Sequence, residues 1–147
     1  MLTVSSLLLG SALAVPSLPP SLVPLHQALL DHGFRVLFRH PTPANAYGRF
    51  ESKTKTLMIS PLAFELGIGA QVFVHEAVHA AQSCPSGSLS PLGWTFPVSP
   101  VVEREISGVL YNAYRHRNKA LEREAFMAQS QSVAPRLLIE AIEARCR

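Results

Sequence analysis

The sequence predicts a single α+β domain in which a small antiparallel sheet or hairpin packs on a buried helix, with further helices toward the C-terminus. Three observations predict this fold class. Short segments rich in branched and aromatic residues lie in the first half, an almost wholly apolar helical segment lies in the middle, and the last third has helical periodicity. The chain has 147 residues, of which 48% are hydrophobic and 16% charged, enough for one hydrophobic core.

Residues 1–14 differ in composition from the rest of the chain. No charged residue lies between Leu2 and Ala14, the centre of the segment is the run from Leu7 to Leu9, and Ala12 and Ala14 form a small-x-small pattern. These features are typical of a secretory signal peptide, and the apolar run is too short for a stable membrane anchor. We therefore expect an exported protein, periplasmic or secreted. The alternative is an N-terminal core helix in a cytoplasmic protein.

Residues 15–33 are expected to form a Pro-rich stretch and a short amphipathic helix, which Gly33 ends. The main domain then spans residues 34–147. Its strands are expected at 34–38, 47–51 and 56–59, the last two forming a hairpin around the polar turn 52–55. Ser60 followed by Pro61 predicts a helix start, because a capping hydroxyl precedes a proline at the first helical position.

The second half of the main domain is expected to be mostly helical. Residues 70–83 are apolar on nearly every side of a helix, which is typical of a helix inside a protein. Residues 85–100 are rich in Ser, Gly and Pro and predict a long loop. Residues 101–117 and 119–147 predict two or three helices, with breaks near Asn118 and Pro135.

The buried helix carries the sequence His75-Glu76-Ala77-Val78-His79. Helical residues four apart share one face, so both imidazoles can bind one ion, and Zn²⁺ readily accepts two such ligands. Glu76 lies beside the ion and not on it, where a carboxylate can take a proton from the attacking water and pass it to a leaving group. Burying these groups unpaired would cost several kcal/mol, so a metal is the expected partner. Two satisfied core histidines beside a buried ion pair are the alternative.

A catalytic zinc site needs a third protein ligand. The other histidines lack a partner at ligand spacing, so a downstream carboxylate is expected. The best segment is 121–126, which contains Glu122 and Glu124 on a predicted helix. Glu103 and Glu105 are further alternatives, although their place in a first helical turn is explained by the helix dipole.

The motif together with a downstream Glu-x-x-small helix resembles the gluzincin metallopeptidases, in the reduced zincin-like form called minigluzincins. The resemblance implies Glu122 as the third ligand, with Glu124 as the alternative, and Ala125 as the small residue that lets two helices approach. It also implies a peptide or protein substrate lying along an edge strand at 56–59. Where the family often has an Asp or Asn that orients a zinc ligand, this chain has Phe126.

The same resemblance implies a Tyr or His that polarises the substrate carbonyl. Tyr114 is expected in this catalytic role, with Tyr111 and His116 as alternatives. Gln82 lies one turn beyond His79 and either hydrogen-bonds near the site or caps the helix. The alternative function is a catalytically inactive zinc-binding interaction protein on the same scaffold.

The remaining features concern crosslinks and partners. In an exported chain, Cys84 and Cys146 are expected to form a disulfide; two isolated thiols are the alternative. The net charge of +3 is small, and its densest cluster, at residues 115–119, lacks interleaved aromatic residues. No nucleic-acid partner is therefore expected, and the sequence leaves the oligomeric state open.

Overall fold

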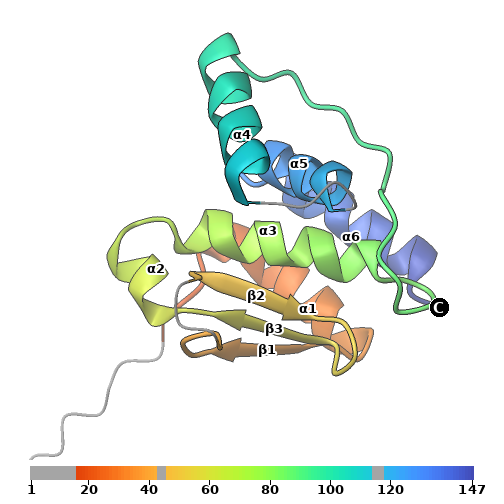
Figure 1. Ribbon diagram of the computed structural model, residues 1–147. Helices are drawn as coiled ribbons and strands as arrows, with labels where there is room; N and C mark the ends of the chain where they lie inside the picture. The colour runs from red at the N-terminus through yellow and green to blue at the C-terminus, as the bar shows by residue number, and fades with distance from the viewer. Residues whose placement is uncertain (1–15, 43–45, 114–117) are drawn as a thin grey trace, which may run out of the picture.

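The computed structural model describes residues 16–42, 46–113 and 118–147. The signal peptide expected at residues 1–14 lies outside them. The architecture is α+β: a small sheet lies against one side of a central helix, and C-terminal helices lie against its other side (Figure 1).

The sheet has three strands, β1 (Arg35–Phe38), β2 (Gly48–Glu51) and β3 (Thr56–Ile59), in the order β1-β3-β2. The expected hairpin is confirmed, because β2 and β3 pair antiparallel across the turn at 52–55. The expected antiparallel sheet or hairpin is confirmed only in part, because the sheet as a whole is mixed. β1 pairs parallel to β3, since the segment between β1 and β2 carries the chain to the far edge before the hairpin returns beside β1.

The position of β3 also corrects the expectation of an edge strand at 56–59. β3 is the central strand, and all four of its residues are buried. Its apolar run of Leu57, Met58 and Ile59 has no polar face, which is typical of a strand covered on both sides. β2 alternates between half-buried and exposed residues, and it is the edge strand that packs beside the central helix.

The helices of the N-terminal half follow the expected pattern. A 3-10 turn, η1 (Pro20–Leu22), leads into α1 (Val23–Asp31), which packs on β1 and on the C-terminal helix. The short α2 (Pro61–Glu65) starts as expected, with the Ser60 hydroxyl accepting a hydrogen bond from the Leu62 amide at 3.3 Å. The central helix α3 (Gly69–Gln82) carries the histidine motif, and 11 of its 14 residues are buried.

Three helices follow the long loop, α4 (Pro100–Ala113), α5 (Lys119–Ala128) and α6 (Ala134–Arg145). The expected breaks are confirmed: Asn118 precedes α5, and Pro135 lies in the first turn of α6. α5 and α6 both pack on α3, whereas α4 packs on α5 and stands away from the sheet (Figure 1). No described helix is long and apolar enough to cross a membrane.

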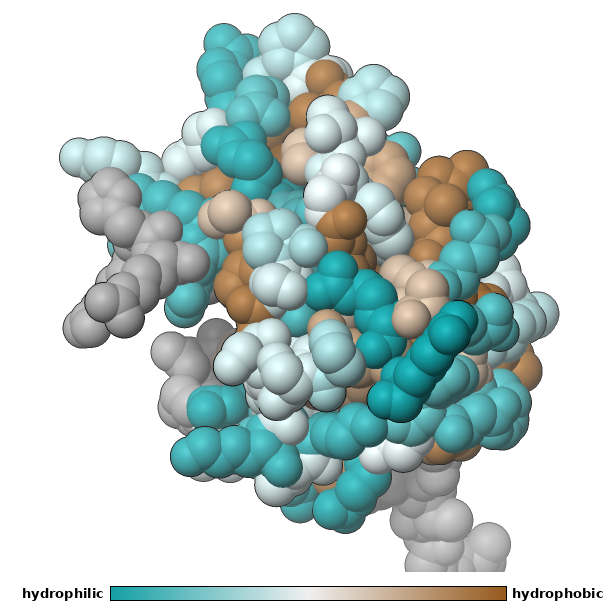
Figure 2. Space-filling model, turned by 90° about the vertical axis from the view of Figure 1, so that its right-hand side faces the viewer, coloured by the Kyte–Doolittle hydropathy of each residue, from teal (hydrophilic) through white to brown (hydrophobic). Residues whose placement is uncertain are grey.

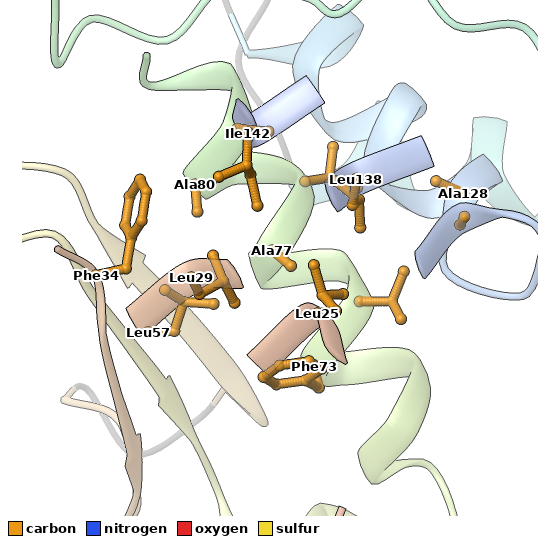
Figure 3. Close-up of a cluster of buried hydrophobic side chains, with 14 of the residues drawn as sticks. Leu25, Leu29, Phe34, Leu57, Phe73, Ala77, Ala80, Ala128, Leu138 and Ile142 are labelled. Atoms are coloured by element: carbon orange, nitrogen blue, oxygen red, sulfur yellow. The ribbon is translucent and has the colours of Figure 1, made fainter. Parts of the chain in front are cut away.

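One hydrophobic core joins these layers (Figure 3). α1, α3 and α6 supply most of it, and the sheet side contributes Phe34 and Leu57; the labelled members are Leu25, Leu29, Phe34, Leu57, Phe73, Ala77, Ala80, Ala128, Leu138 and Ile142. The Cys84 and Cys146 sulfurs are bonded, with their Cα atoms 5.0 Å apart, and so link the end of α3 to the C-terminus. On the side of the molecule where the C-terminus lies, apolar residues are interspersed with polar ones (Figure 2).

The contact between α3 and α5 depends on a small residue. Ala125 is fully buried on α5, whereas Ala120 on the same helix is exposed. We predict that Ala125→Leu forces the helices apart and lowers the free energy of unfolding by about 1–3 kcal/mol. Ala120→Leu, the matched control, should change it by less than about 0.5 kcal/mol. Urea denaturation measures both, and equal midpoints for the two variants would contradict the prediction.

Candidate metal centre

Three side chains from two helices converge at one point. The Nε2 atoms of His75 and His79, on α3, lie 3.2 Å apart. The carboxylate of Glu122, on α5, lies 3.1 Å from His75 Nε2 through Oε2 and 3.3 Å from His79 Nε2 through Oε1. One ligand atom from each residue lies within 4.8 Å of the others, so the three residues could hold a metal ion. The structure thus brings together the two expected histidines and the expected glutamate.

The outer nitrogen of each histidine has its own partner. His75 Nδ1 lies 3.0 Å from Gln129 Oε1, and His79 Nδ1 lies 2.8 Å from Gln82 Oε1. An amide oxygen only accepts, so each Nδ1 carries the hydrogen and donates it. In its neutral state each ring therefore presents an Nε2 lone pair to the centre, which is the form that binds a metal.

This arrangement fits a bound cation. When both rings are neutral, the Nε2 lone pairs of His75 and His79 and the two carboxylate oxygens of Glu122 face one another at hydrogen-bond distance, and all four atoms are acceptors. Four acceptors in contact repel one another unless a positive charge lies among them. Two imidazole nitrogens and one carboxylate are also a donor set typical of zinc and related divalent ions.

The pKa shifts of these groups arise from their contacts with one another. Burial raises the pKa of the Glu122 carboxyl, but hydrogen bonds and charge from the two histidines outweigh burial and lower this pKa to about 2. Burial lowers the pKa of His79, yet the hydrogen bond and charge of Glu122, with the charge of Glu76, leave it above its ordinary value. Both shifts describe the cluster without an ion, where a proton on an imidazole supplies the positive charge that Glu122 accepts.

Glu76 and the three clustered residues line the same cavity, which has a volume of about 650 Å³ and is partly open to solvent. Burial raises the pKa of Glu76; positive charge on His75 and His79 lowers it, but the net direction is upward. A carboxylate whose pKa lies above its usual range is a better base near neutral pH. The cavity lining also includes Gly48 and Phe50 of β2 and residues 87–89 of the long loop.

Glu124, the alternative third ligand, points elsewhere. Its buried carboxylate accepts hydrogen bonds from the backbone amides of Leu92, Gly93 and Trp94 at 2.7–3.0 Å. It also accepts one from Gln82 Nε2 at 3.0 Å. It is therefore a partner of the long loop, and Glu122 is the acidic residue at the cluster.

The other sequence candidates are placed away from the cluster or are not described. Glu103 pairs with Arg123, and Glu105 is exposed on α4. Tyr111 is 80% exposed. Tyr114 and His116 lie outside the described residues.

Phe126, at the position where the resemblance implies an acidic or amide residue, lies with its ring centre 4.6 Å from that of His75. It therefore packs against the ligand ring, and Gln129, three residues later, makes the hydrogen bond to that ring.

Sequence reasoning missed three residues of this site. Gln129 follows α5 and holds His75, but a lone glutamine 54 residues away carries no signal of its own. Asn118 lines the cavity, whereas its sequence context predicts only a helix break. Gly48 allows β2 to approach α3, and its signal was a glycine inside an expected strand, which often marks a close approach of two backbones.

No family model matches the chain, and neither a curated protein nor a solved structure matches it.

Gly48 sets the space available to Glu76. A Cβ atom at this position would lie 2.7 Å from Glu76 Oε1 and 2.6 Å from Val72 Cγ1, so one of them would have to move. We predict that Gly48→Ala lowers the free energy of unfolding by about 1–3 kcal/mol through overpacking. Gly108→Ala, in α4 where a Cβ meets nothing within 4 Å, should raise it by about 0.5–1 kcal/mol. Chemical denaturation measures both, and shifts of the same sign would refute the prediction.

Proposed function

We propose that this protein is a zinc-dependent peptidase with a zincin-like active site. The observation that carries the proposal is the convergence of His75, His79 and Glu122 with Glu76 in the same open cavity. A structural zinc site is closed by four protein ligands, whereas a catalytic one has three and an open position. Three ligands at the wall of a cavity favour the catalytic kind.

In the proposed reaction, water attacks the carbonyl carbon of a peptide bond. A bound zinc ion would polarise the carbonyl and make water more acidic. Glu76 accepts the proton that the water loses and then donates it to the leaving amine, so one carboxylate serves as base and acid in turn. The raised pKa of Glu76 favours its role as the acid, because a carboxyl group with a higher pKa is protonated more readily near neutral pH.

The sheet supports a peptide as the substrate. β2 pairs with β3 on one side only, and Gly48, Arg49 and Phe50 line the cavity. An extended peptide could add to this edge through backbone hydrogen bonds and place a peptide bond near Glu76. β2 thus takes the role that the resemblance implied for residues 56–59. Tyr114 remains our proposal for the group that polarises the carbonyl.

We also propose that the protein is exported, on the composition of residues 1–14. The bond between Cys84 and Cys146 supports this, since disulfides persist in oxidising compartments.

The metal site predicts that zinc stabilises the folded chain. At a free concentration 100-fold above its dissociation constant, one Zn²⁺ per chain should stabilise the fold by about 2.7 kcal/mol, or roughly 5–10 °C in Tm. Glu122→Gln should lose most of this shift because the carboxylate ligand is removed. Glu143→Gln, an exposed glutamate of α6, should keep it. Thermal denaturation with and without Zn²⁺ and metal analysis measure the effect. A wild-type chain that retains no zinc would refute the site.

Peptide hydrolysis is predicted to depend on Glu76. Glu76→Gln keeps the size of the side chain but cannot accept a proton, so activity on unfolded casein or a peptide library should fall about 10²–10⁴-fold. The variant should still bind zinc, because Glu76 is not among the three clustered ligands. If wild type loaded with zinc cleaves no faster than Glu76→Gln, the peptidase proposal is refuted. The alternative, a catalytically inactive zinc-binding interaction protein, then holds.

A further inference from the structure

Gln82 and Glu124 form a buried pair that the proposed reaction does not use. Gln82 is fully buried at the end of α3, and Glu124 is 4% exposed on α5. The Gln82 amide nitrogen donates to Glu124 Oε1 at 3.0 Å and to the Leu121 carbonyl at 3.1 Å. Burying the Glu124 carboxylate costs desolvation free energy, so its hydrogen-bond partners must compensate for that cost.

The hydrogen bonds of this pair have only one consistent direction. Three successive backbone amides, of residues 92–94, donate to Glu124, so its carboxylate accepts throughout. Glu124 and the Leu121 carbonyl can only accept, so the nitrogen of the Gln82 amide must face them. The amide oxygen of Gln82 then faces His79 Nδ1, which must donate. The chain of bonds thus selects the neutral tautomer of His79 whose lone pair is on Nε2, toward the metal site.

The same pair holds the loop that forms one wall of the cavity. Residues 87–89 line the cavity, and the Ser90 amide donates to the Gln82 carbonyl at 2.9 Å. Beyond them, Leu92, Trp94 and Phe96 pack against the core. Residues 85–99 contain no helix or strand, so side chains of other elements hold them. Ser52 donates to the Gly87 carbonyl, and Arg145 donates to the Pro91 carbonyl and the Ser90 hydroxyl. The bonds to Gln82 and Glu124 hold residues 90–94 from the side of the metal site.

We propose that Glu124 is a positioning residue that acts through Gln82. It fixes the ring of His79 in the form that binds metal, and it couples an ion at His79 to the position of the loop at 85–99. The inference rests on the metal site of the proposed function, but not on peptidase activity. His75 has the simpler arrangement, with Gln129 as the partner of its Nδ1, and so provides an internal comparison.

Zinc affinity in a double-mutant cycle tests the first part. Competition with a chromophoric chelator gives the affinity of each variant, and circular dichroism checks that each folds. Glu124→Gln and Gln82→Leu should each weaken zinc binding roughly 10–100-fold, as loss of a group that orients a ligand does. In the Gln82→Leu background, Glu124→Gln should have no further effect, because the connection to His79 is already broken. In the Gln129→Leu background it should keep its full effect.

Trp94, the one tryptophan in the chain, tests the coupling to the loop. Its backbone amide donates to Glu124, and its ring is half-buried. Saturating Zn²⁺ should reduce the quenching of its fluorescence by acrylamide in wild type and in Gln129→Leu. In Gln82→Leu, which keeps every backbone bond to Glu124, the same zinc occupancy should leave quenching unchanged. Because the quenching test uses Gln82→Leu, it can be carried out even if Glu124→Gln does not fold.

The outcomes separate this inference from the proposed function. A wild type that binds no zinc refutes both. A wild type that binds zinc, with the effect of Glu124→Gln undiminished in the Gln82→Leu background, overturns the positioning role alone, since Glu124 then acts only on the loop. Quenching of wild-type Trp94 that zinc does not alter overturns the coupling.

Discussion

The structure depends on one constraint: a helix that is buried on nearly all sides carries several polar side chains, and each needs a partner. His75, His79 and Gln82 lie at positions i, i+4 and i+7 of α3, so they form one stripe on one face. Glu76, beside this stripe, faces β2. α5 meets the stripe with Glu122 at the two histidines and Glu124 at Gln82, and the fully buried Ala125, next to Glu124, allows the close approach.

This constraint explains how much the sequence could predict. The motif helix, the hairpin, the capped start of α2 and the break at Pro135 arise from local patterns of hydrophobicity, turn residues and proline, which the sequence shows directly. The two histidines of the cluster were predictable for the same reason, since their spacing alone places them on one face. Their burial among apolar residues then indicated that a partner must come from another element.

What the sequence could not predict depends on contacts between distant segments. The order of the strands depends on the pairing of β1 with β3, which are distant in sequence. The hairpin pattern alone leaves β3 with one free edge, and the parallel pairing with β1 makes it the central strand. Glu122 and Glu124 are two residues apart, so about 200° of helix rotation separates them. Which one faces the histidines is decided by how α5 packs on α3, and the resemblance, not the local sequence, favoured Glu122. The role of Gln129 likewise requires α5 to end beside His75.

The use of glutamine beside both histidines has an electrostatic consequence. A carboxylate hydrogen-bonded directly to a ligating imidazole adds negative charge next to the metal. Here the groups in contact with the Nδ1 atoms are neutral amides, so Glu122 and Glu76 are the carboxylates nearest the centre. Glu124 lies one residue further out, where three backbone amides already share its charge. A divalent ion at this site would therefore keep more of its positive charge for a bound carbonyl oxygen, while Gln82 still holds the ring of His79 in place.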